Sequence, residues 1–183
     1  MIEKHEWIQR FHEKAGLVQA VVSSVGRLDD VLKYAVDLTV QQQGKTIAAP
    51  GLDGGHLQTL EAMCRPAGLT VLHESLRNHL NDIHTGLTGA DWAIAETGTL
   101  VLDSTSEDLR IATMLSQTHI AWVPASRIQP NAESLSGYLT GKMQSPPGYL
   151  SFITGASRTA DIERVLAIGV HGPQALHILI LET

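Results

Sequence analysis

The sequence contains a single cysteine, Cys64, among 183 residues. A lone cysteine excludes a disulfide within the chain, a zinc site built from cysteines and an iron–sulfur cluster held by this chain alone. Cys64 falls on the apolar side of a helical pattern, and we interpret it as a small buried hydrophobic residue. Low cysteine usage is typical of a reducing compartment, so we expect a cytoplasmic protein.

Basic clusters and long apolar runs are also missing. The formal net charge is -6, and the 13 Lys and Arg residues form no run, which disfavours nucleic acid or an anionic membrane as a partner. No apolar run approaches the roughly 20 residues that a membrane span needs. The first residues, MIEKHEWIQRFHEKAG, lack the apolar core of a signal peptide and show helical spacing instead, which predicts an amphipathic helix over about 2–15. The nine histidines show no i, i+4 pair of the kind found in zinc-binding helices, so we expect no metal site.

Strand-like and helical segments alternate along the chain. Apolar, strand-like runs lie at 16–24, 45–50, 69–74, 119–126, 148–157 and 175–182, and helical periodicity is found at 27–44, 56–68, 75–84, 106–115 and 131–143. This alternation predicts an α/β fold with a mostly parallel sheet and helices on both faces. Between 91 and 103, two strands surround Gly98 with no room for a helix, which predicts an antiparallel or bulged pair inserted in the sheet. We expect one α/β domain over 1–183, with the N-terminal helix packed on it.

The turn ETGT, residues 96–99, places a carboxylate and two hydroxyls between apolar strands. A carboxylate in a buried strand pair is unfavourable unless it is paired or hydrogen-bonded. Glu96 is either satisfied by the backbone N–H groups of its own turn or lies in a cleft, where it would act as a catalytic nucleophile or base. Thr97 and Thr99 flank Gly98 on one side of the strand alternation, so this turn could bind one ligand group.

The segment GASRTADIE, residues 155–163, follows an apolar run and contributes a second polar group. Arg158 has the planar fork that suits a carboxylate or phosphate, and Ser157 and Thr159 add hydroxyls. Asp161 would then orient Arg158 or cap a turn. The alternative is a helix cap with a surface ion pair, and the residues alone do not separate the two interpretations.

Two glycine-rich segments are weaker candidates. The turn GLDGG, with Gly51, Gly54 and Gly55, follows a strand and opens a helix, where free N–H groups could bind an anion; simple turn geometry is the alternative. His171 lies between two glycines in GVHGP and is either a proton carrier or an ordinary turn histidine.

Four longer segments together resemble the lactate utilisation protein C family, whose domain is called LUD: 88–104, 119–128, 151–163 and 169–182. The resemblance implies the α/β fold shared by sugar-phosphate isomerases and coenzyme A transferases. It also implies a role in bacterial oxidation of L-lactate to pyruvate, beside two partner proteins that carry iron–sulfur clusters. This chain would then be an accessory subunit with no cofactor of its own.

A likeness at the level of the fold suggests a second function. In coenzyme A transferases of this fold, a glutamate at the start of an ENG turn attacks the acyl-CoA, and ETG at Glu96 is similar, although Thr97 replaces the asparagine. The alternatives to an accessory subunit are therefore a stand-alone acyl-CoA or small-acid enzyme using Glu96, or a small-molecule binding module without catalysis. In each case we expect one cleft lined by Glu96, Thr97, Thr99, Ser157 and Arg158.

Overall fold

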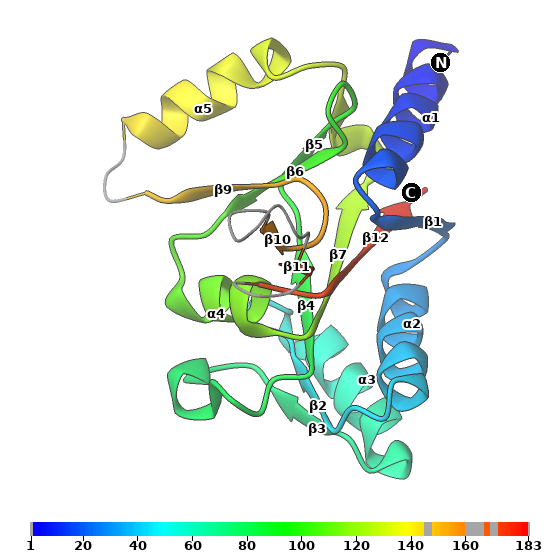
Figure 1. The fold of residues 1–183 in the computed structure, drawn as a ribbon, viewed down its shortest axis with the longest axis vertical. Helices are drawn as coiled ribbons and strands as arrows, with labels where there is room; N and C mark the ends of the chain where they lie inside the picture. Colours follow the sequence, from blue (N-terminus) through cyan, green and yellow to red (C-terminus); the bar gives the residue numbers. More distant parts are fainter. Residues whose placement is uncertain (1, 145–147, 160–166, 169–171, 183) are drawn as a thin grey trace.

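The computed structural model describes residues 2–144, 148–159, 167–168 and 172–182 (Figure 1). Its main sheet has six strands in the order β1-β12-β7-β4-β2-β3, and every neighbouring pair is parallel. The strands are β1 (Val21–Val25), β2 (Thr46–Ala48), β3 (Thr70–Leu72), β4 (Thr85–Gly89), β7 (Thr118–Pro124) and β12 (Ala175–Leu181). This sheet and its flanking helices confirm the predicted α/β class.

Helices cover both faces of the main sheet. They are α1 (Ile2–Leu17), α2 (Leu28–Gln41), α3 (Gly54–Cys64) and α4 (Glu107–Leu115). Side chains alternate along β12, so that Leu179 packs among the core residues of α2 and α3 while Ile178 packs with Phe11 of α1. Ala112 of α4 packs with Ala48 of β2 in a third cluster. The sheet is thus buried on both sides, as parallel sheets usually are.

A second sheet of four strands continues from β4 and β7, in the order β8-β5-β6-β9. Its strands are β5 (Trp92–Ile94), β6 (Thr99–Asp103), β8 (Ile128–Gln129) and β9 (Leu150–Ile153). The pair β5 and β6 is antiparallel, as the sequence predicts. The prediction that this pair is inserted in the main sheet is wrong, because β5 pairs instead with β8 and β6 with β9. Leu100 and Leu102 of β6 belong to the same buried cluster as Ala121 and Val123 of β7, so the two sheets share one core.

The outer face of the second sheet is covered by α5 (Ser136–Met143), which lies beside β9 in Figure 1. Leu135 and Leu139 pack there against Ile94 and Val101. The remaining elements are short: 3-10 turns η1 (Arg65–Ala67), η2 (Leu76–His79), η3 (Ala125–Arg127) and η4 (Glu133–Leu135), and the strands β10 (Arg158–Thr159) and β11 (Ala167–Ile168). Within the described ranges, no helix has the length and apolar character that a membrane crossing requires.

Two segments differ from the sequence expectation. The helix expected over 75–84 is only the 3-10 turn η2, and the strand β4, with the sequence TGLTG, was not predicted at all. Glycine is depleted in strands because its backbone loses more conformational entropy on folding and because it has no side chain to pack. Here Gly86 is required by packing, since a Cβ at this position would lie 2.1 Å from the carbonyl oxygen of Ala112 in α4.

Candidate functional site

Glu96 lies exposed at the turn between β5 and β6. Its backbone N–H donates to the carbonyl of Pro130 (3.0 Å), and the N–H of Gly98 donates to the carbonyl of Ile94 (3.0 Å). The carboxylate has no hydrogen bond to any described residue. The turn is therefore held by its backbone hydrogen bonds. The apolar flanking residues suggest a buried carboxylate, but the Glu96 side chain is exposed.

Three threonines link this turn to the end of β9. The hydroxyls of Thr97 and Thr99 lie 2.7 Å apart, and the Thr99 hydroxyl lies 2.7 Å from that of Thr154. Thr99 is buried, whereas Thr97 and Thr154 are exposed. The chain of hydroxyls fixes the ETGT turn against the loop that follows β9.

Arg158 fastens the same loop to the end of α1. Its Nη2 donates to the carbonyl of Val18 at 2.5 Å. Gly155 approaches this carbonyl closely, since a Cβ built on it would lie 2.5 Å from the Val18 oxygen, and its φ is +76°. One arm of the predicted anion-binding fork is thus occupied by the protein's own backbone.

The other residues of the predicted polar segment fall in different places. The N–H of Ser157 donates to the carbonyl of Pro173 (2.9 Å), which brings the loop after β9 to the start of β12. Thr159 belongs by its backbone to β10. Asp161 and His171 lie outside the described residues.

A cavity of about 360 Å³ lies between β9, the loop after it, the C-terminal end of α4 and the amino ends of β7 and β12. Its lining includes Met114, His119, Phe152, Ser157, Pro173 and Leu176. Of the five residues expected to share a cleft, Ser157 lines this cavity, and the threonine chain reaches it through Thr154. Glu96 and Arg158 do not line it.

His119, near the start of β7, is a buried polar residue of this cavity that the sequence motifs did not point to. The side chain is 1% exposed, and its Nε2 lies 2.8 Å from the hydroxyl of Thr88 on β4. The Nδ1 atom has no hydrogen-bond partner among the described residues. Burial lowers the pKa of His119 to about 4, so the imidazole is neutral at pH 7. A histidine inside the apolar run THIAWV is the signal that could have identified it.

In the glycine turn before α3, the Asp53 carboxylate occupies the place predicted for a bound anion. The Asp53 carboxylate accepts hydrogen bonds from the N–H groups of Gly55 (3.0 Å) and His56 (3.1 Å) and caps the helix. A hydrogen bond from His56 is the main cause that lowers the pKa of Asp53. Gly51 has a φ of +82°, which the turn requires, and Gly54 begins the helix. The N–H groups of Gly55 and His56 are therefore already paired with a carboxylate of the chain.

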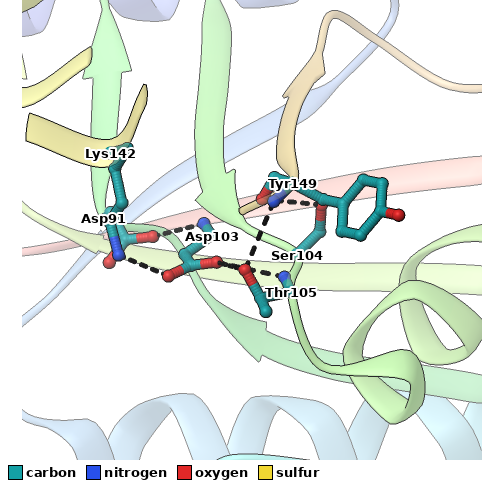
Figure 2. Close-up of polar contacts among 6 residues, drawn as sticks. All are labelled: Asp91, Asp103, Ser104, Thr105, Lys142 and Tyr149. Atoms are coloured by element: carbon teal, nitrogen blue, oxygen red, sulfur yellow. Dashed lines mark hydrogen bonds and ion pairs between the residues drawn. The ribbon is translucent and has the colours of Figure 1, made fainter. Parts of the chain in front are cut away.

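A polar network joins the end of β6 to α5 and to Tyr149, which precedes β9 (Figure 2). Asp103, at the end of β6, forms an ion pair with Lys142 of α5 and accepts hydrogen bonds from the N–H (3.0 Å) and hydroxyl (2.6 Å) of Thr105. Its own N–H donates to the carboxylate of Asp91 (2.6 Å). The hydrogen bond from Lys142 is the main cause that lowers the pKa of Asp103 to about 2. The network fixes α5 to the second sheet.

The Asp103→Asn variant is expected to lose about 1 kcal/mol of unfolding free energy, because the ion pair is partly exposed (37% and 30% for the two side chains) and water screens it. Urea denaturation at pH 7 measures the loss. Asp37→Asn is the matched control, since Asp37 lies exposed on α2 with no side-chain hydrogen bond to a described residue. Equal stability of the two variants would contradict a structural role for the network.

Glu96→Gln tests whether the exposed carboxylate acts chemically. Since the side chain is exposed and contacts no described hydrogen-bonding group, we expect the unfolding free energy to change by less than about 0.5 kcal/mol. If Glu96 is catalytic, activity falls while the melting temperature is kept. Marked unfolding, with activity preserved per folded molecule, would identify a structural residue instead.

The sequence matches a protein family and named relatives. Residues 7–181 match the LUD domain family. Proteins named "Lactate utilization protein C" are 36% identical in Geobacillus thermodenitrificans and 38% identical in Bacillus subtilis, each over 103 residues that cover 54% of this chain and 43% of that protein. The match thus spans less than half the length of these relatives.

A solved structure gives the same fold. The crystal structure of a DUF162 family protein from Deinococcus radiodurans superimposes with a TM-score of 0.66, over 98% of both chains, at 19% sequence identity. Identity this low is informative about the fold alone. The family match, in contrast, covers nearly the whole chain and confirms the resemblance seen in the sequence motifs: the chain belongs to the LUD domain family.

Proposed function

We propose that this protein acts in the bacterial oxidation of L-lactate to pyruvate, as an accessory subunit beside partner proteins that carry iron–sulfur clusters. The observation that carries the proposal is family membership together with relatives named for lactate utilisation at 36–38% identity. The proposed location is the cytoplasm.

The cysteine content supports placing the electron carriers in other subunits. A cluster with four cysteine ligands cannot form on a chain that has only Cys64. This thiol is 1% exposed, and burial raises its pKa to about 11, so it is a poor metal ligand and nucleophile at pH 7. In the proposed complex the partner proteins carry the electrons, and this subunit contributes binding contacts rather than electron transfer.

The position of Glu96 favours this role over the transferase alternative. A glutamyl thioester is an intermediate that water destroys, so an enzyme that forms one keeps it in a shielded cleft. Glu96 instead lies exposed on a turn and outside the cavity beside β9.

Reconstitution tests the proposal. We expect the purified protein to be colourless and to show no L-lactate-dependent dye reduction alone. A tagged chain isolated from cells grown on L-lactate should bring down brown iron–sulfur proteins, and this complex should reduce the dye. Lactate oxidation by the lone protein, or a preparation from such cells without iron–sulfur partners, would contradict the proposal. Trapping of a glutamyl thioester at Glu96 with an acyl-CoA would favour the transferase.

A further inference from the structure

The hydrogen bond between His119 and Thr88 fixes which ring nitrogen carries the proton. Thr88 is fully buried, and its hydroxyl has no hydrogen-bond partner among the described residues other than Nε2 of His119, at 2.8 Å. A buried hydroxyl proton without an acceptor is unfavourable, so Thr88 donates and Nε2 accepts. Because the buried imidazole is neutral, its one proton then lies on Nδ1.

The Nδ1–H group is consequently a donor in need of an acceptor. It is buried, and no described residue accepts its hydrogen bond. His119 lines the cavity beside β9, so this unpaired donor belongs to a residue of the cavity wall. Buried donors are almost always paired, and a histidine held in one tautomer by a neighbouring hydroxyl is already oriented for that partner.

The remainder of the lining disfavours a charged ligand. None of the described residues that line the cavity is Asp, Glu, Lys or Arg. The Thr113 hydroxyl already donates to the carbonyl of Arg110 (3.0 Å), and the Ser151 hydroxyl donates to the hydroxyl of Ser104 (2.7 Å). A carboxylate here would lose hydration without gaining a cation from any described lining residue, which is unfavourable.

The apolar part of the lining shows what the cavity accommodates instead. Met114, Phe152 and Leu176 provide aliphatic and aromatic surface, and the volume of about 360 Å³ is in the range of small-molecule sites. We propose that this cavity binds an uncharged, largely apolar molecule that presents a carbonyl oxygen to Nδ1–H of His119. The inference goes beyond the role in lactate oxidation and does not depend on it, because it rests on the lining of this cavity alone. It disfavours lactate and pyruvate as occupants of the cavity.

Three aromatic probes of similar shape test the proposal: benzamide has a neutral carbonyl, benzoate a carboxylate and toluene neither. Their affinities are measured by NMR titration of the ¹⁵N-labelled protein, in which the imidazole signals of His119 report the contact. We expect benzamide to shift the His119 signals and to bind at least roughly tenfold more tightly than benzoate. L-lactate and pyruvate should leave these signals unchanged.

Two variants separate the hydrogen bond from the apolar contacts. His119→Leu removes the donor and should weaken benzamide roughly fivefold while toluene binds as before. His119→Asn retains an N–H donor near the position of Nδ1 and should restore part of the affinity. If His119→Leu fails to fold, the titration of the unmodified protein decides alone. Tighter binding of benzoate or lactate, equal affinity of His119→Leu for benzamide, or no response of His119 to any probe would overturn the proposal.

Discussion

Replacing Gly98 with alanine is expected to lower the unfolding free energy by about 3 kcal/mol. Gly98 has a φ of +66°, where an L-residue is strained, and a Cβ at this position would lie 2.3 Å from the backbone nitrogen of Ala15 in α1. Backbone atoms of a helix cannot move aside as the end of a flexible side chain can. The ETGT turn and α1 would therefore separate, and the melting temperature should fall by roughly 10 °C.

Gly68→Ala is a closely matched control. Gly68 has a φ of +67°, nearly that of Gly98, but a Cβ there meets nothing within 4 Å. This variant carries the conformational strain without the clash and should lose only about 1 kcal/mol. Thermal and urea unfolding of both variants measure the difference. Equal losses would show that α1 does not pack on the turn as described.

Acidification from pH 7 to pH 4 is expected to destabilise the protein by up to about 3 kcal/mol through His119. Burial lowers the pKa of His119 from 6.5 to about 4 in the folded state. Between these values the unfolded chain binds a proton that the folded chain does not, so stability falls as the pH falls. Burial lowers the pKa of His84 and His177 as well, which adds to the trend.

Urea denaturation at intervals between pH 7 and pH 4 measures this dependence. His119→Gln should flatten the curve, whereas His5→Gln, at an exposed position on α1, should keep the slope of the unmodified protein. Asp103 does not confuse the result, because its pKa of about 2 means that its contribution is lost only below about pH 3.8. An unchanged slope in His119→Gln would show that this imidazole is not buried in its neutral form.

Local patterns in the sequence predict most of the elements but not their arrangement. The apolar run of β12 identifies a buried strand, and the antiparallel pair around Gly98 follows from the absence of room for a helix. The sheet to which that pair belongs depends on β8 and β9, which lie far away in the sequence. Apolar strands look alike whichever neighbour they pair with, so no local pattern places β5 and β6.

The candidate site shows the same limit. Ser157 and the three linked threonines could be expected from hydroxyls at strand ends, but the use of Arg158 as a clamp on Val18 depends on a contact with α1. The role of His119 depends on its hydrogen bond with Thr88. Thr88 lies on β4, whose glycines make this strand hard to recognise from the sequence. A polar residue in a buried strand is informative only once its cross-strand partner is known.

Deletion of the gene, followed by growth on L-lactate as the sole carbon source, tests the proposed role most directly. In a strain with no other lactate dehydrogenase, we expect the deletion to abolish growth on L-lactate and to spare growth on pyruvate, since only the oxidation step is lost. Expression of the intact chain should restore growth. Unimpaired growth of the deletion strain on L-lactate would contradict a role in lactate oxidation.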